Sequence, residues 1–154
     1  METHAKFLAV VTALMVAFSS QALAQEDASP GITPDSIFYG LDKAFERIQF
    51  ILARDETSKA RKHLEFAAER IAETKAMADK GKPEYIPDLT EEYEVSINKS
   101  QEIAEIAQGL GKNVTKVNEL VALATSVHLE VLEEVYMKVP EQAKPALQRA
   151  MNSS

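Results

Sequence analysis

The sequence predicts an all-α protein, an antiparallel bundle of four long helices followed by a short C-terminal helix. Four successive segments repeat apolar residues at spacings of three and four, which is the period of an amphipathic helix. Short connections containing glycine, proline or capping residues separate these segments, and short connections favour antiparallel neighbours. No segment alternates apolar and polar residues convincingly, as a half-buried strand would.

The first predicted helix runs from Pro34 to about Arg54. Thr33 suits the N-cap, and Pro34 suits the first helical position, where the missing backbone N–H is not needed. Polar residues occupy most of the remaining positions of this segment. The apolar stripe, which we expect to face the core, consists of Phe38, Leu41, Phe45, Ile48 and Leu52.

The second and third predicted helices each carry one inward stripe. Asp55 can cap the second helix, and Gly81 ends it. Asp88 and Glu91 have the spacing of a capping box at the start of the third helix, which ends at Gly109. The expected inward residues are Ala60, Leu64, Ala67, Ile71 and Ala78 in the second helix, and Leu89, Tyr93, Ile97, Ser100, Ala104 and Ala107 in the third.

The fourth predicted helix begins after Asn113, which can cap it, and ends before Val139-Pro140. A short terminal helix follows Pro140, either interrupted or restarted at Pro145. The wide apolar surface of the fourth helix includes Val117, Leu120, Val121, Ala124, Val127, Val131 and Val135.

The first 24 residues have the pattern of a secretory signal peptide. Lys6 precedes an apolar run over residues 7–18, and Ala22 and Ala24 suit cleavage before Gln25. We therefore expect a signal peptide at 1–24, a polar leader at 25–33 and a single helical domain at 34–154. The expected location is periplasmic, cell-surface or extracellular. The alternative is an uncleaved anchor, and membrane contact is expected only in that case, although the run is short for a bilayer span.

Composition excludes several classes of function. The chain has 24 acidic and 17 basic residues and a net charge of −7, which disfavours binding to nucleic acid or anionic lipid. It contains no cysteine, so disulfides, thiolate metal sites and cysteine nucleophiles are excluded. Packing of the core must therefore stabilise the fold.

Two histidines stand in similar local sequences. His63 and His128 are each followed by leucine and glutamate, so the imidazoles, with Glu65 and Glu130, are candidate ligands for Zn²⁺, Ni²⁺ or Cu²⁺. Glu-x-x-His, the spacing of bundle di-metal sites, is absent from the chain. Counted from their helix starts, the two histidines differ in height by about 10 Å. We therefore predict no metal and no cofactor, and expect His128 to be a partly buried histidine bonded to a carboxylate or a carbonyl.

Pairs of acidic residues four positions apart are candidates for general acid and base catalysis. We instead expect them to lie on a solvated face with salt bridges to residues such as Lys43, Arg47 and Arg70. The serines lack a Gly-x-Ser-x-Gly elbow, and no glycine-rich phosphate loop is present, so no enzymatic activity is predicted. The pairs are Asp42 with Glu46, Glu65 with Glu69, and Glu130 with Glu134.

The opening of the domain resembles a known family. The residues that carry the resemblance are the block from Pro30 to Asp42, which reads Pro-Gly-Ile-Thr-Pro-Asp-Ser-Ile-Phe-Tyr-Gly-Leu-Asp, then Phe45-Glu46-Arg47, and later Leu64-Glu65-Phe66-Ala67 with Glu69-Arg70. The sequence is similar here to exported helical domains of unknown function from archaea and bacteria. Gly40 departs from the bulkier residue expected at its position. The resemblance implies export and a helical fold, and it supplies no functional residues.

These observations predict an exported, non-enzymatic domain of the cell envelope that acts by binding or by structural interaction. The expected partner is an envelope or surface protein of unknown identity, and no small-molecule substrate is evident. The alternative is an envelope metal-binding or metal-sensing bundle that uses His63 and His128.

Overall fold

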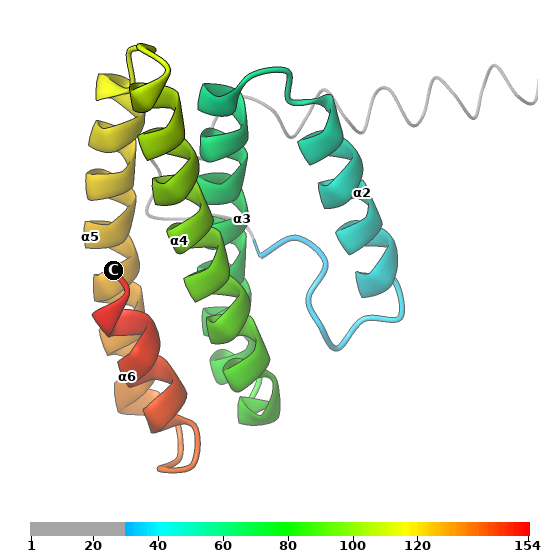
Figure 1. The fold of residues 1–154 in the computed structure, drawn as a ribbon. Coiled ribbons are helices and arrows are strands. Elements are labelled where there is room, and N and C mark those ends of the chain that lie inside the picture. Colours follow the sequence, from blue (N-terminus) through cyan, green and yellow to red (C-terminus); the bar gives the residue numbers. More distant parts are fainter. Residues whose placement is uncertain (1–29) are drawn as a thin grey trace, which may run out of the picture.

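The computed structural model describes residues 30–154, so the predicted signal peptide and the leader up to residue 29 lie outside the described residues. Helices are the only regular elements among residues 30–154, with turns between them, which confirms the all-α class (Figure 1). Within residues 30–154, no helix has both the length and the apolar content needed to cross a membrane. The elements are α2 (Tyr39–Leu52), α3 (Glu56–Asp79), the 3₁₀ turn η1 (Pro83–Tyr85), α4 (Ile86–Gly109), α5 (Thr115–Lys138) and α6 (Lys144–Asn152).

The main core lies between α3, α4 and α5, and α6 closes one end of it (Figure 1). Its largest members include Leu64, Tyr93, Ile97 and Leu132, while α6 contributes Leu147. A smaller cluster of Ala60, Ala104 and Val117 fills the other end. The alanines allow close approach there, and the Ser100 hydroxyl donates a 2.9 Å hydrogen bond to the carbonyl of Ala60.

Contacts between the helices define their directions. Ser100 of α4 meets Ala60 and Glu92 meets Arg70, so α3 and α4 run in opposite directions. Lys75 pairs with Glu134 at 2.9 Å and Asp79 pairs with Lys138 at 3.0 Å. Both pairs join residues 59 positions apart, so α3 and α5 run in the same direction.

Several predicted helix ends are confirmed. Asp55 caps α3 by accepting a 2.9 Å hydrogen bond from the backbone N–H of Ser58. Gly81 and Gly111 follow α3 and α4 with positive φ angles of 67° and 75°, a conformation that favours glycine. The predicted Asn113 cap is one residue off, because the cap position of α5 is Val114, although the Asn113 side chain accepts a 3.0 Å hydrogen bond from the backbone N–H of Thr115.

Two predicted starts are wrong. Thr33 does not cap a helix, because α2 begins only at Tyr39 and its cap position is Phe38. The Thr33 hydroxyl instead donates to Asp35 at 2.5 Å, and Lys80 and Lys82 hold the same carboxylate. This link to the end of α3 stabilises turns where the sequence predicted helix.

The predicted capping box is also absent. The turn η1 leads directly into α4 at Ile86, so Asp88 lies in the first turn of the helix instead of at its cap. At the other end of the domain, α5 ends before Val139 and α6 begins at Lys144, so the terminal helix restarts beside Pro145.

The residues predicted to face inward are buried in some helices and exposed in others. All six predicted residues of α4 are buried, and four of the five in α3 are buried, with Ala78 partly exposed. In α5 only Val117 and Val135 of the predicted surface are buried, together with His128 and Leu132. The prediction for α2 is wrong, because no residue of that helix is buried. Its predicted inward residues Phe38, Leu41, Ile48 and Leu52 are exposed.

Candidate functional site

Helix α2 stands at the edge of the other helices and meets them mainly through polar side chains, with Phe50 packed against His63 of α3 (Figure 1). Tyr39, Lys43 and Glu46 lie at spacings of three and four, so they share one face of the helix. This face contacts α3 and α4 through side-chain hydrogen bonds and ion pairs. The amphipathic helix is therefore present as predicted, but its polar face is the one that docks.

Arg70 of α3 is the centre of the contact, and only 1% of its side chain is exposed. Its Nη1 donates a 2.6 Å hydrogen bond to the Tyr39 hydroxyl and lies 3.1 Å from the Glu73 carboxylate. Nη2 pairs with Glu46 of α2, and Nη1 also lies 3.3 Å from Glu92 of α4. One guanidinium thus joins three helices, which suits its planar set of donors.

We call this group the ionic cluster, and its carboxylates outnumber its cations. Burial, the largest effect, raises the pKa of Glu73 to about 8, although Arg70 opposes the change. Burial likewise raises the pKa of Glu69 to about 7, and the nearby Glu46 carboxylate adds to the increase. The positive charge of Arg70 is therefore too little to keep both Glu69 and Glu73 fully ionised at neutral pH. The members of the ionic cluster are Tyr39, Lys43, Glu46, Glu69, Arg70, Glu73 and Glu92.

The ionic cluster corrects the expectation of a solvated charged face. Burial, and then Glu46, raises the pKa of Asp42, so this predicted surface pair is partly withdrawn from water. In the second pair Glu65 forms the expected ion pair with Lys62, whereas Glu69 belongs to the ionic cluster. The third pair behaves as expected for the surface, since Lys138 and Lys75 lower the pKa of Glu134 to about 2. Glu130 is exposed on α5.

A signal for the buried arginine was present in the sequence. Arg70, Thr74 and Met77 follow Ala67 at spacings of three and four, so they continue its inward face. All three are buried. A buried charged residue at such a position requires partners, and side chains of α2 and α4 supply them together with Glu73 of α3 itself.

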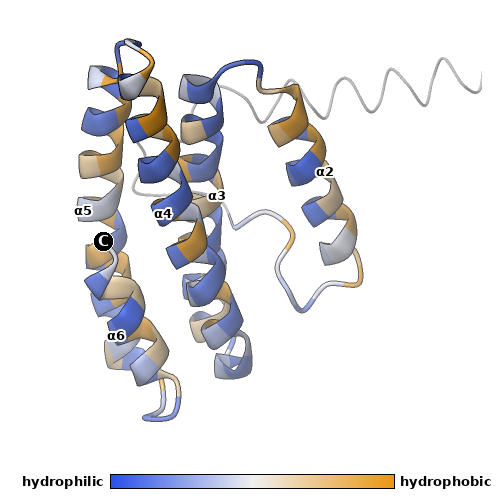
Figure 2. Ribbon diagram, in the orientation of Figure 1, coloured by the Kyte–Doolittle hydropathy of each residue, from blue (hydrophilic) through white to orange (hydrophobic). Residues whose placement is uncertain are grey.

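The opposite side of α2 is apolar and open to solvent. Ile37 is 92% exposed and Ile51 is 77% exposed, and a Cβ added at Gly40 would meet nothing within 4 Å. Figure 2 shows hydrophobic residues along this helix at the edge of the molecule. We call this surface the α2 outer face and define it by Ile37, Phe38, Leu41, Ala44, Ile48, Ile51 and Leu52.

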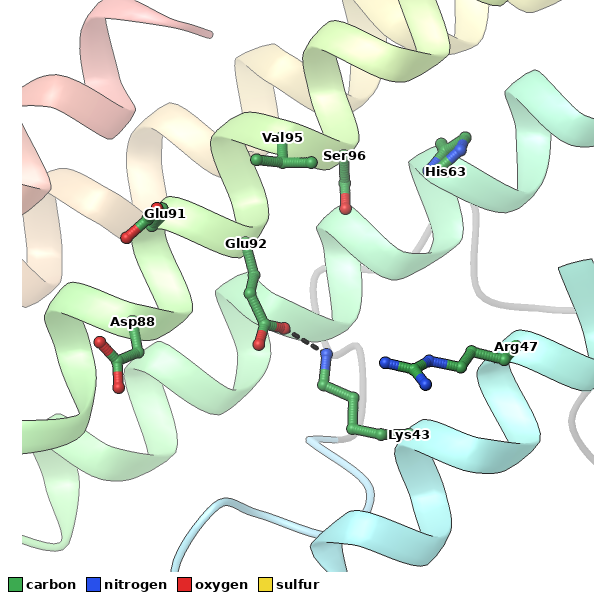
Figure 3. A pocket seen from close by; sticks show the side chains of 8 residues that line it. All are labelled: Lys43, Arg47, His63, Asp88, Glu91, Glu92, Val95 and Ser96. Carbon is green, nitrogen blue, oxygen red and sulfur yellow. Dashed lines mark hydrogen bonds and ion pairs between the residues drawn. The ribbon is translucent and has the colours of Figure 1, made fainter.

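A shallow groove of about 610 Å³ separates α2 from α4. Lys43 and Arg47 of α2 and His63 of α3 line it, and Figure 3 shows Asp88 and Glu91 on α4 lying apart from Lys43 and Arg47. Lys43 is already paired with Glu92. The groove therefore exposes basic side chains of α2 and acidic side chains of α4 to solvent, and the Lys43–Glu92 ion pair bridges the two helices. The remaining lining residues are Val95 and Ser96.

The candidate metal ligands occupy two separate aromatic environments. His63 packs against Phe50 with ring centroids 4.9 Å apart, while His128 meets Tyr93 edge-on at 5.4 Å. Because α3 and α5 are parallel with a 59-residue offset, His63 is level with Ala122 and lies about 9 Å along the axis from His128. Within residues 30–154 no three acidic or histidine side chains are grouped to hold a metal ion.

His128 also departs from its predicted bonding. It is buried where only partial burial was predicted, and its Nδ1 has no hydrogen-bond partner among the described residues, where a carboxylate or carbonyl was predicted. Burial lowers its pKa to about 4, which keeps the imidazole neutral near pH 7. The Nδ1 of His63 likewise has no partner in this part of the chain, and burial lowers its pKa.

Comparisons with known proteins place the chain in a family without assigning an activity. No curated protein and no solved structure matches it. A family model described as "Domain of unknown function (DUF5667)" matches residues 31–142, which span α2 to α5 and most of the chain. The chain therefore belongs to this family of domains of unknown function.

Proposed function

We propose that this protein is an exported, non-enzymatic interaction domain of the cell envelope and that the α2 outer face is its binding element. The observation that carries the proposal is the orientation of α2, whose polar side docks on the ionic cluster while its apolar side faces solvent. Apolar surface left in water is unfavourable, and contiguous patches of this kind mark interaction sites.

The size of the patch supports this function. Taking about 200 Å² for a fully exposed side chain, the exposed fractions of its six large residues correspond to on the order of 800 Å². The largest apolar patch on a typical monomer is about 300–600 Å². The α2 outer face is therefore larger than the scattered hydrophobic surface that folded proteins tolerate.

Cross-linking in cells tests the function. A photoreactive benzophenone residue at Ile51 should form covalent adducts with a neighbouring polypeptide in the native envelope. The matched control carries the same residue at Leu123, which is also exposed but lies on α5. Adducts at Ile51 no more abundant than those at Leu123 would refute the proposed binding element, whatever the identity of the neighbour.

The export component rests on the sequence of residues 1–24 and has its own test. We expect material recovered outside the cytoplasm to begin at Gln25, as measured by intact mass. Retention of residues 1–24 on a membrane-bound product would replace cleavage with an anchored form. Retention of the chain in the cytoplasm would refute export.

A further inference from the structure

The apolar residues of the α2 outer face are arranged around Ala44. Leu41, Ala44, Ile48 and Ile51 of α2 follow one another at spacings of three and four, which is the repeat of two helices packed along a seam, and Ile37 lies four positions before Leu41 in the turn that leads into the helix. Ala44, the smallest of them, is at the centre. Large residues lie on both sides of it: Leu41 three positions before and Ile48 four after, with Ile37 seven before and Ile51 seven after.

A row of apolar residues arranged in this way can pack against the same row of a second helix that runs in the opposite direction. If two α2 helices cross at Ala44 in opposite directions, Ile37 of one meets Ile51 of the other, and Leu41 meets Ile48. Ala44 meets its own copy at the point of closest approach, where a small side chain is needed. Each copy then presents the same surface to the other, which is the defining property of an isologous two-fold interface.

The edges of the face are also compatible with this arrangement. Phe38 and Leu52 lie along the same edge of the α2 outer face, at its opposite ends. Across the two-fold axis, Phe38 of one copy would therefore cover Leu52 of the other. Arg47 on the other edge would meet Gly40 of the second copy, a position with open space beside it and no charge. The face itself contains no acidic residue, which keeps the net negative charge of the two chains away from the contact.

We propose that the α2 outer face binds the same face of a second copy, with the two α2 helices antiparallel about a two-fold axis at Ala44. This inference rests on the proposed function, and it names a second copy of the chain as the partner that binds the α2 outer face. The available apolar surface, on the order of 800 Å² per copy, matches the roughly 800 Å² that each partner buries in a standard stable interface.

The oligomeric state of the purified protein is the first test. Sedimentation equilibrium over a wide range of concentration should show a reversible dimer. Ile48→Glu should weaken dimerisation by about 100-fold or more, because it places a charge in the apolar seam. Leu123→Glu is the matched control on α5 and should leave the dimer unchanged. A chain that is monomeric at all concentrations, or a dimer that Ile48→Glu does not weaken, would overturn the proposal.

Single cysteines test the direction of the helices, since the chain has no cysteine of its own. On mild oxidation Ala44→Cys should form a disulfide-linked dimer, whereas Ile51→Cys alone should not, because its two copies would be about 20 Å apart. A mixture of Ile37→Cys and Ile51→Cys should yield the mixed dimer. Self-linkage of Ile51→Cys without the mixed product would overturn the antiparallel arrangement.

Cross-linking in cells separates this inference from the proposed function. Adducts at Ile51 that contain only a second copy of the chain support both. Adducts with a different protein, together with a monomeric purified chain, would overturn the second-copy inference while leaving the interaction function in place.

Discussion

The guanidinium of Arg70 donates a 2.6 Å hydrogen bond to the hydroxyl of Tyr39, and that hydroxyl lies 3.2 Å from the Glu73 carboxylate to which it donates. This relay joins α2 to two adjacent turns of α3. Because α2 has no buried residue of its own, its position depends on such polar contacts and on the packing of Phe50 against His63. The orientation of the α2 outer face is therefore set by the ionic cluster on the other side of the helix.

Replacement of Tyr39 by phenylalanine tests this dependence. Tyr39→Phe removes an acceptor from buried Arg70 and a donor from buried Glu73, so we expect a loss of about 1–3 kcal/mol in the free energy of unfolding. Tyr136→Phe is the control, because the Tyr136 hydroxyl makes no side-chain hydrogen bond among residues 30–154. Urea melts should separate the two variants, and equal midpoints would contradict the role of the relay.

Stability should fall as the pH rises from 7 to 9. Folded Glu73 has a raised pKa of about 8, so it holds a proton at pH 7 that an unfolded glutamate, with its ordinary pKa of 4.5, has already lost. Unfolding then releases a proton, and alkaline pH favours it, by at most about 1.4 kcal/mol per pH unit for each proton. The lowered pKa values of His63 and His128 affect stability only below this range.

Glu73→Gln identifies the group responsible. Glutamine imitates the protonated acid but cannot titrate, so the dependence of the urea midpoint on pH should become flatter between pH 7 and 9. Glu134→Gln is the matched control, because Lys138 and Lys75 lower the pKa of that exposed acid to about 2. The same slope in wild type and Glu73→Gln would show that another group titrates.

Burial of Leu64 gives a prediction for the core. Leu64→Ala should destabilise the fold by about 2–5 kcal/mol through lost apolar contacts and the cavity left behind. Leu123→Ala makes the same chemical change at a side chain that is 50% exposed, and it should cost less than about 1 kcal/mol. At concentrations where the chain is monomeric, Ile48→Ala should resemble the control. A small effect of Leu64→Ala would mean that the core of α3 is misassigned.

The inward face of α4 was predictable because its stripe packs mainly against apolar residues of α3, α5 and α6. Tyr93 and Ile97 illustrate this, since both are fully buried in the main core. For such a helix the apolar face and the buried face are the same surface. Periodicity then suffices to identify the residues that face inward.

The same reasoning failed for α2 because periodicity finds an apolar face without identifying what that face meets. The buried charge of Arg70 requires acceptors, and Tyr39 and Glu46 of α2 supply them. The partners lie 31 and 24 positions away in the sequence. Spacing within one helix cannot reveal a pairing of that range, so the candidate surface could be found only from the structure.

Metal binding provides the last prediction, because paired histidines were the one arrangement in the sequence that suggested a cofactor. Zinc requires nitrogen ligands at about 2.0–2.1 Å, so imidazoles about 9 Å apart along parallel helices cannot share an ion. Calorimetry with Zn²⁺, Ni²⁺ and Cu²⁺ should therefore show no stoichiometric binding tighter than about micromolar, although exposed carboxylates can collect divalent ions weakly. The controls are His63→Ala and His128→Ala, which should give the same isotherms as wild type. One equivalent of tightly bound metal, lost in both variants, would establish the metal-sensing alternative and require the histidines to approach one another in solution.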